Sequence, residues 1–433
     1  MTAANGGNAS FTPAQRVTTL TLLTVTYFFS YMDRQIMSIL VEPVKAEFHL
    51  TDAQMGLLGG LVFAIFYATL GIPVAALSDR INRRRIIAVS LTLWSAFTVA
   101  CGFAHNFVQL LLYRIGVGVG EAGSSPPSHS LIADLYPPEK RAGALAIYSL
   151  GVNVGAAAGT IIGGTVAHYY GWRMAFIAVG APGILLALFV WLFVANPRRG
   201  ESEPQPHDDS EKPGIWAGVK ALATTRAALH LTAGFTLTST VGYGLTYWGP
   251  AYYIRSFNFT MLDISAKITP ILAIAGIAGV VFGGSLANWC ARRWGLWSQA
   301  TMIALLKTIA LPFAALLYLT NDPWVGLAAY FVSVLFASCY LGPTFSLIQT
   351  LAPVRMRALW ASIILFVNNL IGLGLGPTAI GTLSDWLRPF YGDDSLRWAL
   401  FIGLMATPWA IFHYWRAGVA LKRSGFIKNT AES

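Results

Sequence analysis

Residues 53–104 read AQMGLLGGLVFAIFYATLGIPVAALSDRINRRRIIAVSLTLWSAFTVACGFA, which are two long apolar runs joined by a short charged loop. Each run, 53–78 and 86–104, has the roughly 17–25 residues that an α-helix needs to cross a hydrocarbon core about 30 Å thick. The charged side chains are confined to the loop between them, residues 79–85. The stretch therefore predicts a helical hairpin in a membrane.

The rest of the chain repeats this pattern. Hydrophobic residues make up 55% of the sequence and charged residues only 11%, whereas a soluble domain carries about 25% charge. We expect an all-α integral membrane protein with twelve spans, at about 17–41, 53–78, 86–104, 107–134, 142–168, 174–195, 227–254, 264–289, 299–319, 324–350, 358–385 and 396–416.

Basic residues are divided unequally between the two sides of these spans. Of the 29 Lys and Arg residues, 20 fall in the tails and loops that share a side with both termini, and 6 fall on the opposite side. Because cytoplasmic loops carry the excess of Lys and Arg, we expect both termini in the cytoplasm of a plasma (inner) membrane protein. This bias accounts for the net charge of +10 and leaves no basic soluble face for nucleic acid.

A polar stretch at 196–213 divides the spans into two sets of six. The two sets repeat weakly, because Pro137-x-x-x-Arg141-Ala142 returns as Pro353-x-x-x-Arg357-Ala358. Parallel six-span halves with a site at their interface are known from transporters. We expect the following parts: a tail at 1–15, a six-helix bundle at 16–196, a cytoplasmic linker at 197–225, a second six-helix bundle at 226–418 and a tail at 419–433.

The loop Ser78-Asp79-Arg80-Ile81-Asn82-Arg83-Arg84-Arg85 resembles the motif between the second and third helices of the major facilitator superfamily. Ala75 and Asn82 stand where that motif usually has glycines. The resemblance implies pseudo-symmetric six-helix bundles and alternating access. It also implies that Asp79, Arg80, Arg83 and Arg84 help to close the cytoplasmic side. A solvated loop that obeys the positive-inside rule is the alternative.

A narrower resemblance runs through the first half of the chain. It is carried by Tyr31-Met32-Asp33-Arg34, Gly56-Leu57-Leu58, Trp94-Ser95-Ala96, Arg114-x6-Glu121-Ala122, Pro126 and Asp134-Leu135-Tyr136-Pro137. These segments are similar to the Spinster branch of the facilitators, whose animal members export sphingosine-1-phosphate or lysophospholipids. The second half is similar only diffusely.

Four charged residues, Asp33, Arg34, Arg114 and Glu121, lie inside expected spans. A charge at mid-membrane costs about 2.5–3.5 kcal/mol on insertion scales, so such residues mark functional sites by default. Asp33 and Arg114 lie at matching depths in antiparallel spans, which predicts a contact between them. We interpret Asp33 and Glu121 as proton-coupling groups, and Arg34 and Arg114 as charge partners that bind an anionic substrate. A purely structural ion-pair cluster is the alternative.

The second half offers an aromatic and mildly polar wall. Its candidates are Tyr243, Tyr247, Trp248, Tyr340, Asn368 and Asn369. Such a wall suits an amphiphile with an apolar tail, although core packing explains the same residues. Lys307 lies within an otherwise uncharged span, where its side chain can extend toward the cytoplasm.

Glycines recur at every fourth position of the expected fifth span, at Gly151, Gly155, Gly159 and Gly163. This spacing lines one helix face and allows another helix to approach closely, either as fixed packing or as a sliding surface.

These features predict a secondary active transporter that uses a proton gradient to move an anionic or zwitterionic amphiphile such as a lysolipid. A small organic anion is the alternative substrate. An intramembrane hydrolase built on Ser125 and His129 is the alternative of another class. We expect a functional monomer surrounded by membrane lipids. No cofactor, metal or ATP site is predicted, because the three cysteines are far apart and no Gly-x4-Gly-Lys loop is present.

Overall fold

The computed structural model describes residues 11–78, 81–198, 201 and 214–424, and within these residues all regular structure is helical. The first half of the chain consists of α1 (Pro13–Ile39), α2 (Val41–Phe48), α3 (Asp52–Gly59), α4 (Leu61–Ser78), α5 (Arg83–Cys101), α6 (Phe107–Glu121), α7 (Ser125–Leu135), α8 (Pro138–Tyr170) and α9 (Trp172–Phe193).

The second half follows a short linker helix, α10 (Ile215–Thr224). It consists of α11 (Arg226–Phe257), α12 (Met261–Asp263), η1 (Ile264–Ile268), α13 (Thr269–Trp294), α14 (Trp297–Leu319), α15 (Pro323–Ala337), η2 (Ser338–Tyr340), α16 (Leu341–Leu351), η3 (Val354–Met356), α17 (Arg357–Val367), η4 (Asn368–Leu373), α18 (Gly374–Tyr391), η5 (Gly392–Asp394), α19 (Ser395–Leu404) and α20 (Thr407–Arg423). The α10 helix packs against α17, because a Cβ atom on Gly218 would lie 2.4 Å from a methyl group of Leu359.

Eight segments of the described chain are long and apolar enough to cross a membrane. One of them, Leu359–Arg423, contains two crossings, formed by α17–α18 and by α19–α20. The helix α1, the pair α6–α7 and the helix α11 are long enough to make three more crossings, although they carry more polar residues. Together these are the twelve crossings that the sequence predicts, so the predicted fold class is confirmed.

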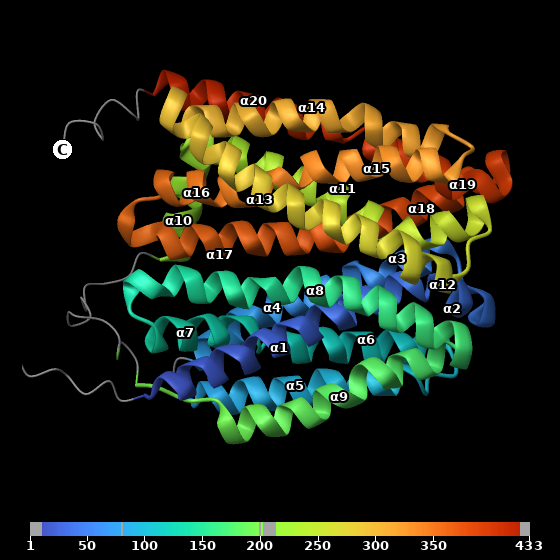
Figure 1. Cartoon of the computed structure of the whole chain (residues 1–433), viewed down its shortest axis with the longest axis horizontal. Helices are drawn as coiled ribbons and strands as arrows, with labels where there is room; N and C mark the ends of the chain where they lie inside the picture. The colour runs from blue at the N-terminus through green and yellow to red at the C-terminus, as the bar shows by residue number, and fades with distance from the viewer. Residues whose placement is uncertain (1–10, 79–80, 199–200, 202–213, 425–433) are drawn as a thin grey trace, which may run out of the picture.

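The two halves lie side by side, with the blue-to-green half below the yellow-to-red half in Figure 1. We call the end where α1 begins and α20 finishes the terminal end, which is on the left of Figure 1. The opposite end, where α1, α8 and α11 reach Ile39, Tyr170 and Phe257, is the distal end. The short helices α2 and α3 lie at the distal end, where the halves meet.

The glycine face of α8 packs against α1, as the spacing predicts. A Cβ atom on Gly151 would lie 2.8 Å from the carbonyl oxygen of Thr24, and one on Gly155 would lie 2.3 Å from that of Phe28. No larger residue fits at these distances, so the two backbones run in close contact. This packing fixes the position of α1, which carries Asp33 and Arg34.

Candidate functional site

The four charged residues of the first half form two ion pairs. Arg34 Nε donates a hydrogen bond of 2.7 Å to Glu121 Oε2, and Arg114 Nη1 lies 3.4 Å from Asp33 Oδ1. Asp33, Arg114 and Glu121 are buried, whereas the Arg34 side chain keeps 12% of its surface exposed. The contact expected between Asp33 and Arg114 is therefore present, and Arg34 is the most accessible charge of the cluster.

One hydroxyl group contacts each of the two carboxylates. Ser30 Oγ donates to Glu121 Oε2 at 2.8 Å, and Thr98 Oγ1 contacts Asp33 Oδ2. The cluster thus ties α1, α5 and α6 together. Two buried atoms, Glu121 Oε1 and Arg114 Nε, have no hydrogen-bond partner among the described residues. A carboxylate oxygen is a hydrogen-bond acceptor and a guanidinium N–H is a donor, so both atoms keep unused hydrogen-bonding capacity.

Aromatic rings surround the Arg34 guanidinium. Its central carbon lies 4.4 Å from the ring centroid of Tyr67, 4.9 Å from that of Tyr31 and 5.0 Å from that of Phe63. Each ring face attracts the cation, and such contacts reach about 2 kcal/mol when they are desolvated. The rings therefore stabilise a charged Arg34 inside the cluster.

The aromatic candidates of the second half divide into two groups. Tyr243 and Tyr340 are partly exposed, and Tyr243 packs against a core cluster made mainly of residues of the first half. Tyr247 and Trp248 are buried and bind backbone carbonyls: Tyr247 Oη donates to Met55 O at 2.7 Å, and Trp248 Nε1 donates to Pro377 O at 2.8 Å. The structure therefore places these two residues in the packing at the distal end rather than on an open wall.

The two asparagine candidates lie in η4, where the eleventh span changes from an α-helix to a π-helix. Asn368 is buried and Asn369 is partly exposed. The Oδ1 atom of Asn368 has no hydrogen-bond partner among the described residues. Single-turn π-helices occur frequently at functional sites, which makes Asn368 the stronger candidate of the pair.

Of the expected cytoplasmic gate, Asp79 and Arg80 lie outside the described residues. Arg83 is buried, contacts Asp134, and donates to Ser130 Oγ at 2.7 Å and to Pro197 O at 2.6 Å. Arg84 Nη1 lies 3.5 Å from Val194 O. These contacts stay within the first half, so a role in closing the gate between the halves stays a prediction.

The distal end holds an ion-pair network between the halves that the sequence analysis missed. Arg255 of α11 donates to both carboxylate oxygens of Asp52, each at 2.8 Å, and lies 2.7 Å from Glu42 Oε1. Asp52, which is buried, also contacts Lys45 and accepts a hydrogen bond of 2.7 Å from Ser384. Arg255 and Ser384 belong to the second half, so the network joins the two bundles.

A second carboxylate of the second half caps α3. Asp385 accepts hydrogen bonds from the backbone N–H groups of Asp52 at 3.0 Å and Ala53 at 2.7 Å. A carboxylate at a helix N-terminus satisfies free N–H groups and complements the helix dipole. The hydrogen bonds that join described residues of the two halves involve 42–56, 160, 247–265 and 378–385. The distal end is therefore closed.

We expect Arg255→Gln to open the distal end. Removal of one partner of a buried ion pair costs about 3–5 kcal/mol, which shifts an equilibrium between two states by more than about 100-fold. Spin labels at Ala46→Cys and Arg388→Cys, both exposed, would measure the distance across this end. The three native cysteines are buried and should not be labelled. An unchanged distance distribution would show that the network does not hold the closed state.

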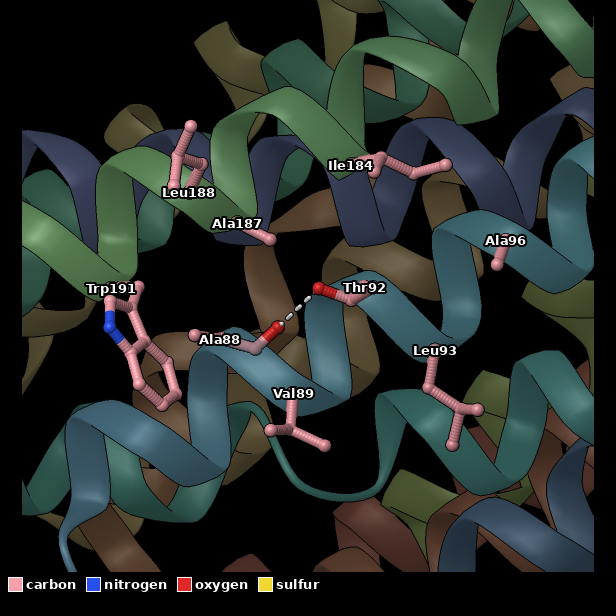
Figure 2. A pocket seen from close by; sticks show the side chains of 9 residues that line it. All are labelled: Ala88, Val89, Thr92, Leu93, Ala96, Ile184, Ala187, Leu188 and Trp191. Carbon is pink, nitrogen blue, oxygen red and sulfur yellow. Dashed lines mark hydrogen bonds between the residues drawn. The ribbon is translucent and has the colours of Figure 1, made fainter.

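A shallow groove on the outside of the first half lies away from these charges. Figure 2 shows it between α5 and α9, lined by the residues Ala88, Val89, Thr92, Leu93, Ala96, Ile184, Ala187, Leu188 and Trp191. The Thr92 hydroxyl is occupied by a hydrogen bond of 2.9 Å to Ala88 O. Apart from this occupied hydroxyl, the side chains that line the groove are apolar, and none of them is charged.

Comparison with known proteins agrees with this architecture. A model of the Major Facilitator Superfamily matches residues 23–417. An MFS-type efflux pump of Mycolicibacterium smegmatis is 32% identical over 399 residues, which are 91% of this chain and 90% of that protein. Protein spinster of Drosophila melanogaster is 31% identical over 284 residues, which are 64% of this chain and 46% of that protein.

A solved structure is also similar over nearly the whole chain. It is the crystal structure of a bacterial homolog of the human lysosomal transporter Spinster, in an inward-facing and unoccupied conformation. It matches with a TM-score of 0.86 and 29% sequence identity, and covers 95% of this chain and 99% of that one.

The same comparisons bear on the hydrolase alternative. The relatives are transporters or efflux pumps, and none of those named here is a hydrolase. The His129 ring packs edge-on against Tyr148, with ring centroids 5.2 Å apart, which is the contact of a packed side chain. The chain therefore belongs to the Major Facilitator Superfamily and is a Spinster-like, multi-pass membrane transporter.

Proposed function

We propose that the protein moves an anionic amphiphile such as a lysolipid together with protons. The observation that carries this proposal is the pairing of Arg34 with Glu121. Arg34 is the partly exposed cation of the cluster, and its nearest carboxylate has one oxygen without a hydrogen-bond partner. A proton bound at Glu121 removes the charge that holds Arg34 and leaves the guanidinium available to an anion.

Proton binding and anion binding then support each other. With Glu121 charged, the 2.7 Å ion pair competes with any substrate anion for Arg34. With Glu121 neutral, an anion at Arg34 restores the balance of charge inside the membrane, where an unpaired charge is costly. The two ligands therefore cross together, and substrate accumulates on the more alkaline side. Asp33 and Arg114 form the second such pair in the same cluster.

The aromatic surroundings support an amphiphile as the substrate. Tyr31, Phe63 and Tyr67 surround the Arg34 guanidinium, and Tyr243 and Tyr340 continue the aromatic lining in the second half. Such rings provide apolar contact area for a lipid tail, and tyrosine hydroxyls can also bind a polar head group.

For the orientation, we propose that the terminal end faces the cytoplasm. The excess of basic residues at this end supports it. The closed distal end then faces outward, and the structure represents an inward-facing state like that of the solved bacterial homolog. We further propose that a single chain transports alone, because one chain contains both halves and every residue of the cluster.

Transport by the purified protein in liposomes tests this proposal. With an acidic exterior and an alkaline interior, we expect the vesicles to accumulate lysophosphatidylglycerol. An ionophore that dissipates the pH gradient should abolish the accumulation, because the driving force for uphill transport is then lost. Accumulation of gluconate but of no lysolipid would favour the small organic anion instead. Accumulation that is insensitive to the ionophore would contradict proton coupling.

A further inference from the structure

Lys307 is a buried cation in the middle of α14, in the second half. Only 4% of its surface is exposed, and its Nζ lies 4.8 Å from the ring centroid of Tyr340. Its ammonium makes no ion pair or hydrogen bond to another described residue. The side chain therefore packs inside the bundle instead of extending to the cytoplasm.

The contacts of Lys307 do not compensate for the free-energy cost of burying its charge. The desolvation of an ammonium group inside a protein costs several kcal/mol, and a buried contact with an aromatic face returns about 2 kcal/mol or somewhat more. Arg34 and Arg114 each have a carboxylate, whereas Lys307 has none among the described residues. A negatively charged group from outside the chain would supply the missing partner.

Polar groups from three other segments form a series of contacts that begins at Tyr340, the ring beside Lys307. Tyr340 Oη lies 3.5 Å from Ser239 Oγ of α11. A Cβ atom on Gly372 would lie 3.1 Å from the Cβ of Ser239 and 3.4 Å from Asn368 Oδ1, so the asparagine and the serine flank the same small residue. Asn368 is 4% exposed, and its Oδ1 has no hydrogen-bond partner among the described residues.

Two of the membrane spans that supply these groups, those of Tyr340 and Asn368, depart from regular α-helix at these residues. Tyr340 ends the 3₁₀ segment η2, and Asn368 begins the π segment η4. Irregular backbone is tolerated at membrane depth where protein buries it or where it lines a cavity. Two such breaks next to an unpaired cation and an unpaired acceptor are typical of a ligand site rather than of ordinary packing.

We propose that Lys307, Tyr340, Ser239 and Asn368 form a second substrate subsite, which binds a negatively charged group that has a hydroxyl beside it. The ammonium and the two hydroxyls donate to a phosphate or carboxylate, and the Asn368 oxygen accepts from the ligand hydroxyl. A lysolipid head group and a small hydroxy acid share this chemistry. The subsite rests on the proposed function, in that its ligand is the transported substrate.

The subsite gives the second half a hold on the substrate that does not require a neutral Glu121. Arg34 in the first half becomes available when Glu121 is neutral, whereas Lys307 has no internal anion to release. Tyr243 of α11 packs against the core cluster, made mainly of residues of the first half, that contains Phe63, one of the rings around Arg34. An anion that is held first at Lys307 and then shared with Arg34 would draw the two halves together.

Binding measurements on the full-length protein test the subsite. The probes are lysophosphatidylglycerol, the neutral monoacylglycerol with the same tail, and gluconate. Lys307→Met should weaken binding of the transported anion about 10- to 150-fold, because one charge-assisted contact is lost. Binding of the neutral lipid should not change, and Lys307→Arg should retain most of the affinity for the anion.

Lys422→Met is the matched control. Lys422 also lies over an aromatic ring, 4.6 Å from the centroid of Trp297, but it belongs to the last turn of α20. This variant should bind every probe as the wild type does. In addition, Lys307→Met should raise the melting temperature of the ligand-free protein, because the variant removes an uncompensated buried charge. A lysine that only stabilises the fold would lower it.

A separate pair of probes tests the proposed contact between Asn368 and a hydroxyl group of the ligand. Asn368→Leu should reduce the preference for gluconate over hexanoate, because hexanoate has no hydroxyl to donate. If Lys307→Met does not fold, Tyr340→Phe keeps the ring and removes one donor, and it should weaken binding of the anionic probe without affecting the neutral lipid.

The outcomes separate this inference from the proposed function. Lysolipid transport that is indifferent to Lys307→Met would overturn the subsite and leave the proposed function standing. Gluconate binding that depends on Lys307, without lysolipid binding, would support the subsite and contradict the amphiphile. If Lys307→Met weakened the binding of neutral and anionic probes equally, or if the wild type bound neutral lipids alone, Lys307 would be structural.

Discussion

Glu121→Gln should abolish proton-driven accumulation while the protein still folds. The amide is close in shape to the carboxylic acid and can still accept from Arg34 and Ser30, which now contact Glu121 Oε2. It cannot take up or release a proton. A gradient of two pH units supports an accumulation of up to about 100-fold when one proton moves with each anion, and we expect the ratio to fall to about one.

Asp33→Asn should have the same consequence through the second pair, although it also leaves the buried Arg114 without its carboxylate. Both variants should still allow downhill movement or exchange of substrate, since the helices that rearrange are unchanged. The measurement is uptake into proteoliposomes with and without a pH gradient. Full uphill transport by both variants would show that the cluster is a structural ion-pair network without a role in coupling.

Glu47→Gln is a suitable control for these acids. Glu47 lies in α2 outside the spans, and its Oε2 accepts hydrogen bonds of 2.7 Å from Arg173 and from Trp172. The hydrogen bond from Arg173 lowers the pKa of Glu47 below its usual value. The carboxylate therefore stays charged at the pH of a transport assay and cannot cycle a proton. Its removal should leave the accumulation ratio unchanged.

Gly56→Leu should trap the protein with its distal end open and stop transport. A Cβ atom at this position would lie 2.5 Å from Pro377 O and 2.9 Å from the Cα of Thr378, which are backbone atoms of the other half. Backbone cannot move aside as a flexible side chain does, so closure of α3 on α18 requires a glycine here. A larger side chain forbids the closed state and leaves the open state undisturbed.

The same contact is tight at two further glycines. A Cβ atom on Gly60 would lie 2.7 Å from Gly374 O, and one on Gly381 would lie 2.3 Å from Asp52 O. We expect the distance between labels at Ala46→Cys and Arg388→Cys to lengthen in Gly56→Leu. Gly71→Leu is the control, because no other atom lies within 4 Å of a Cβ at that position. A Gly56→Leu protein that closes normally would refute the close-contact argument.

The sequence predicted the fold because membrane helices are specified locally. Each crossing needs a long apolar run, and the runs at 53–78 and 86–104 could be recognised without knowing their neighbours. Spacing also predicted the glycine contact of α8 with α1. Depth in the membrane, which follows from position in a span, was enough to bring Asp33 opposite Arg114.

Features that depend on the rotation and register of separate helices could not be predicted. The distal network joins Asp52 to Arg255 and Asp385, residues that are far apart in the sequence, and their charges at helix ends look like ordinary loop residues. Tyr247 and Trp248 were expected to line a cavity, but their hydrogen bonds hold the distal end. Local composition does not distinguish a lining aromatic from a packed one.

The cap that Asp385 places on α3 links two events that are usually considered separately. The Asp385 carboxylate, which accepts from the N–H groups of Asp52 and Ala53, belongs to the opposite bundle and moves with it. When the bundles separate, these two N–H groups lose their acceptor and must bind water instead. Separation of the halves and fraying of the N-terminus of α3 therefore become one step with one activation barrier. A change at residue 385 would then set how often the distal end opens without altering any member of the charged cluster. Turnover and affinity could thus be adjusted independently in this transporter.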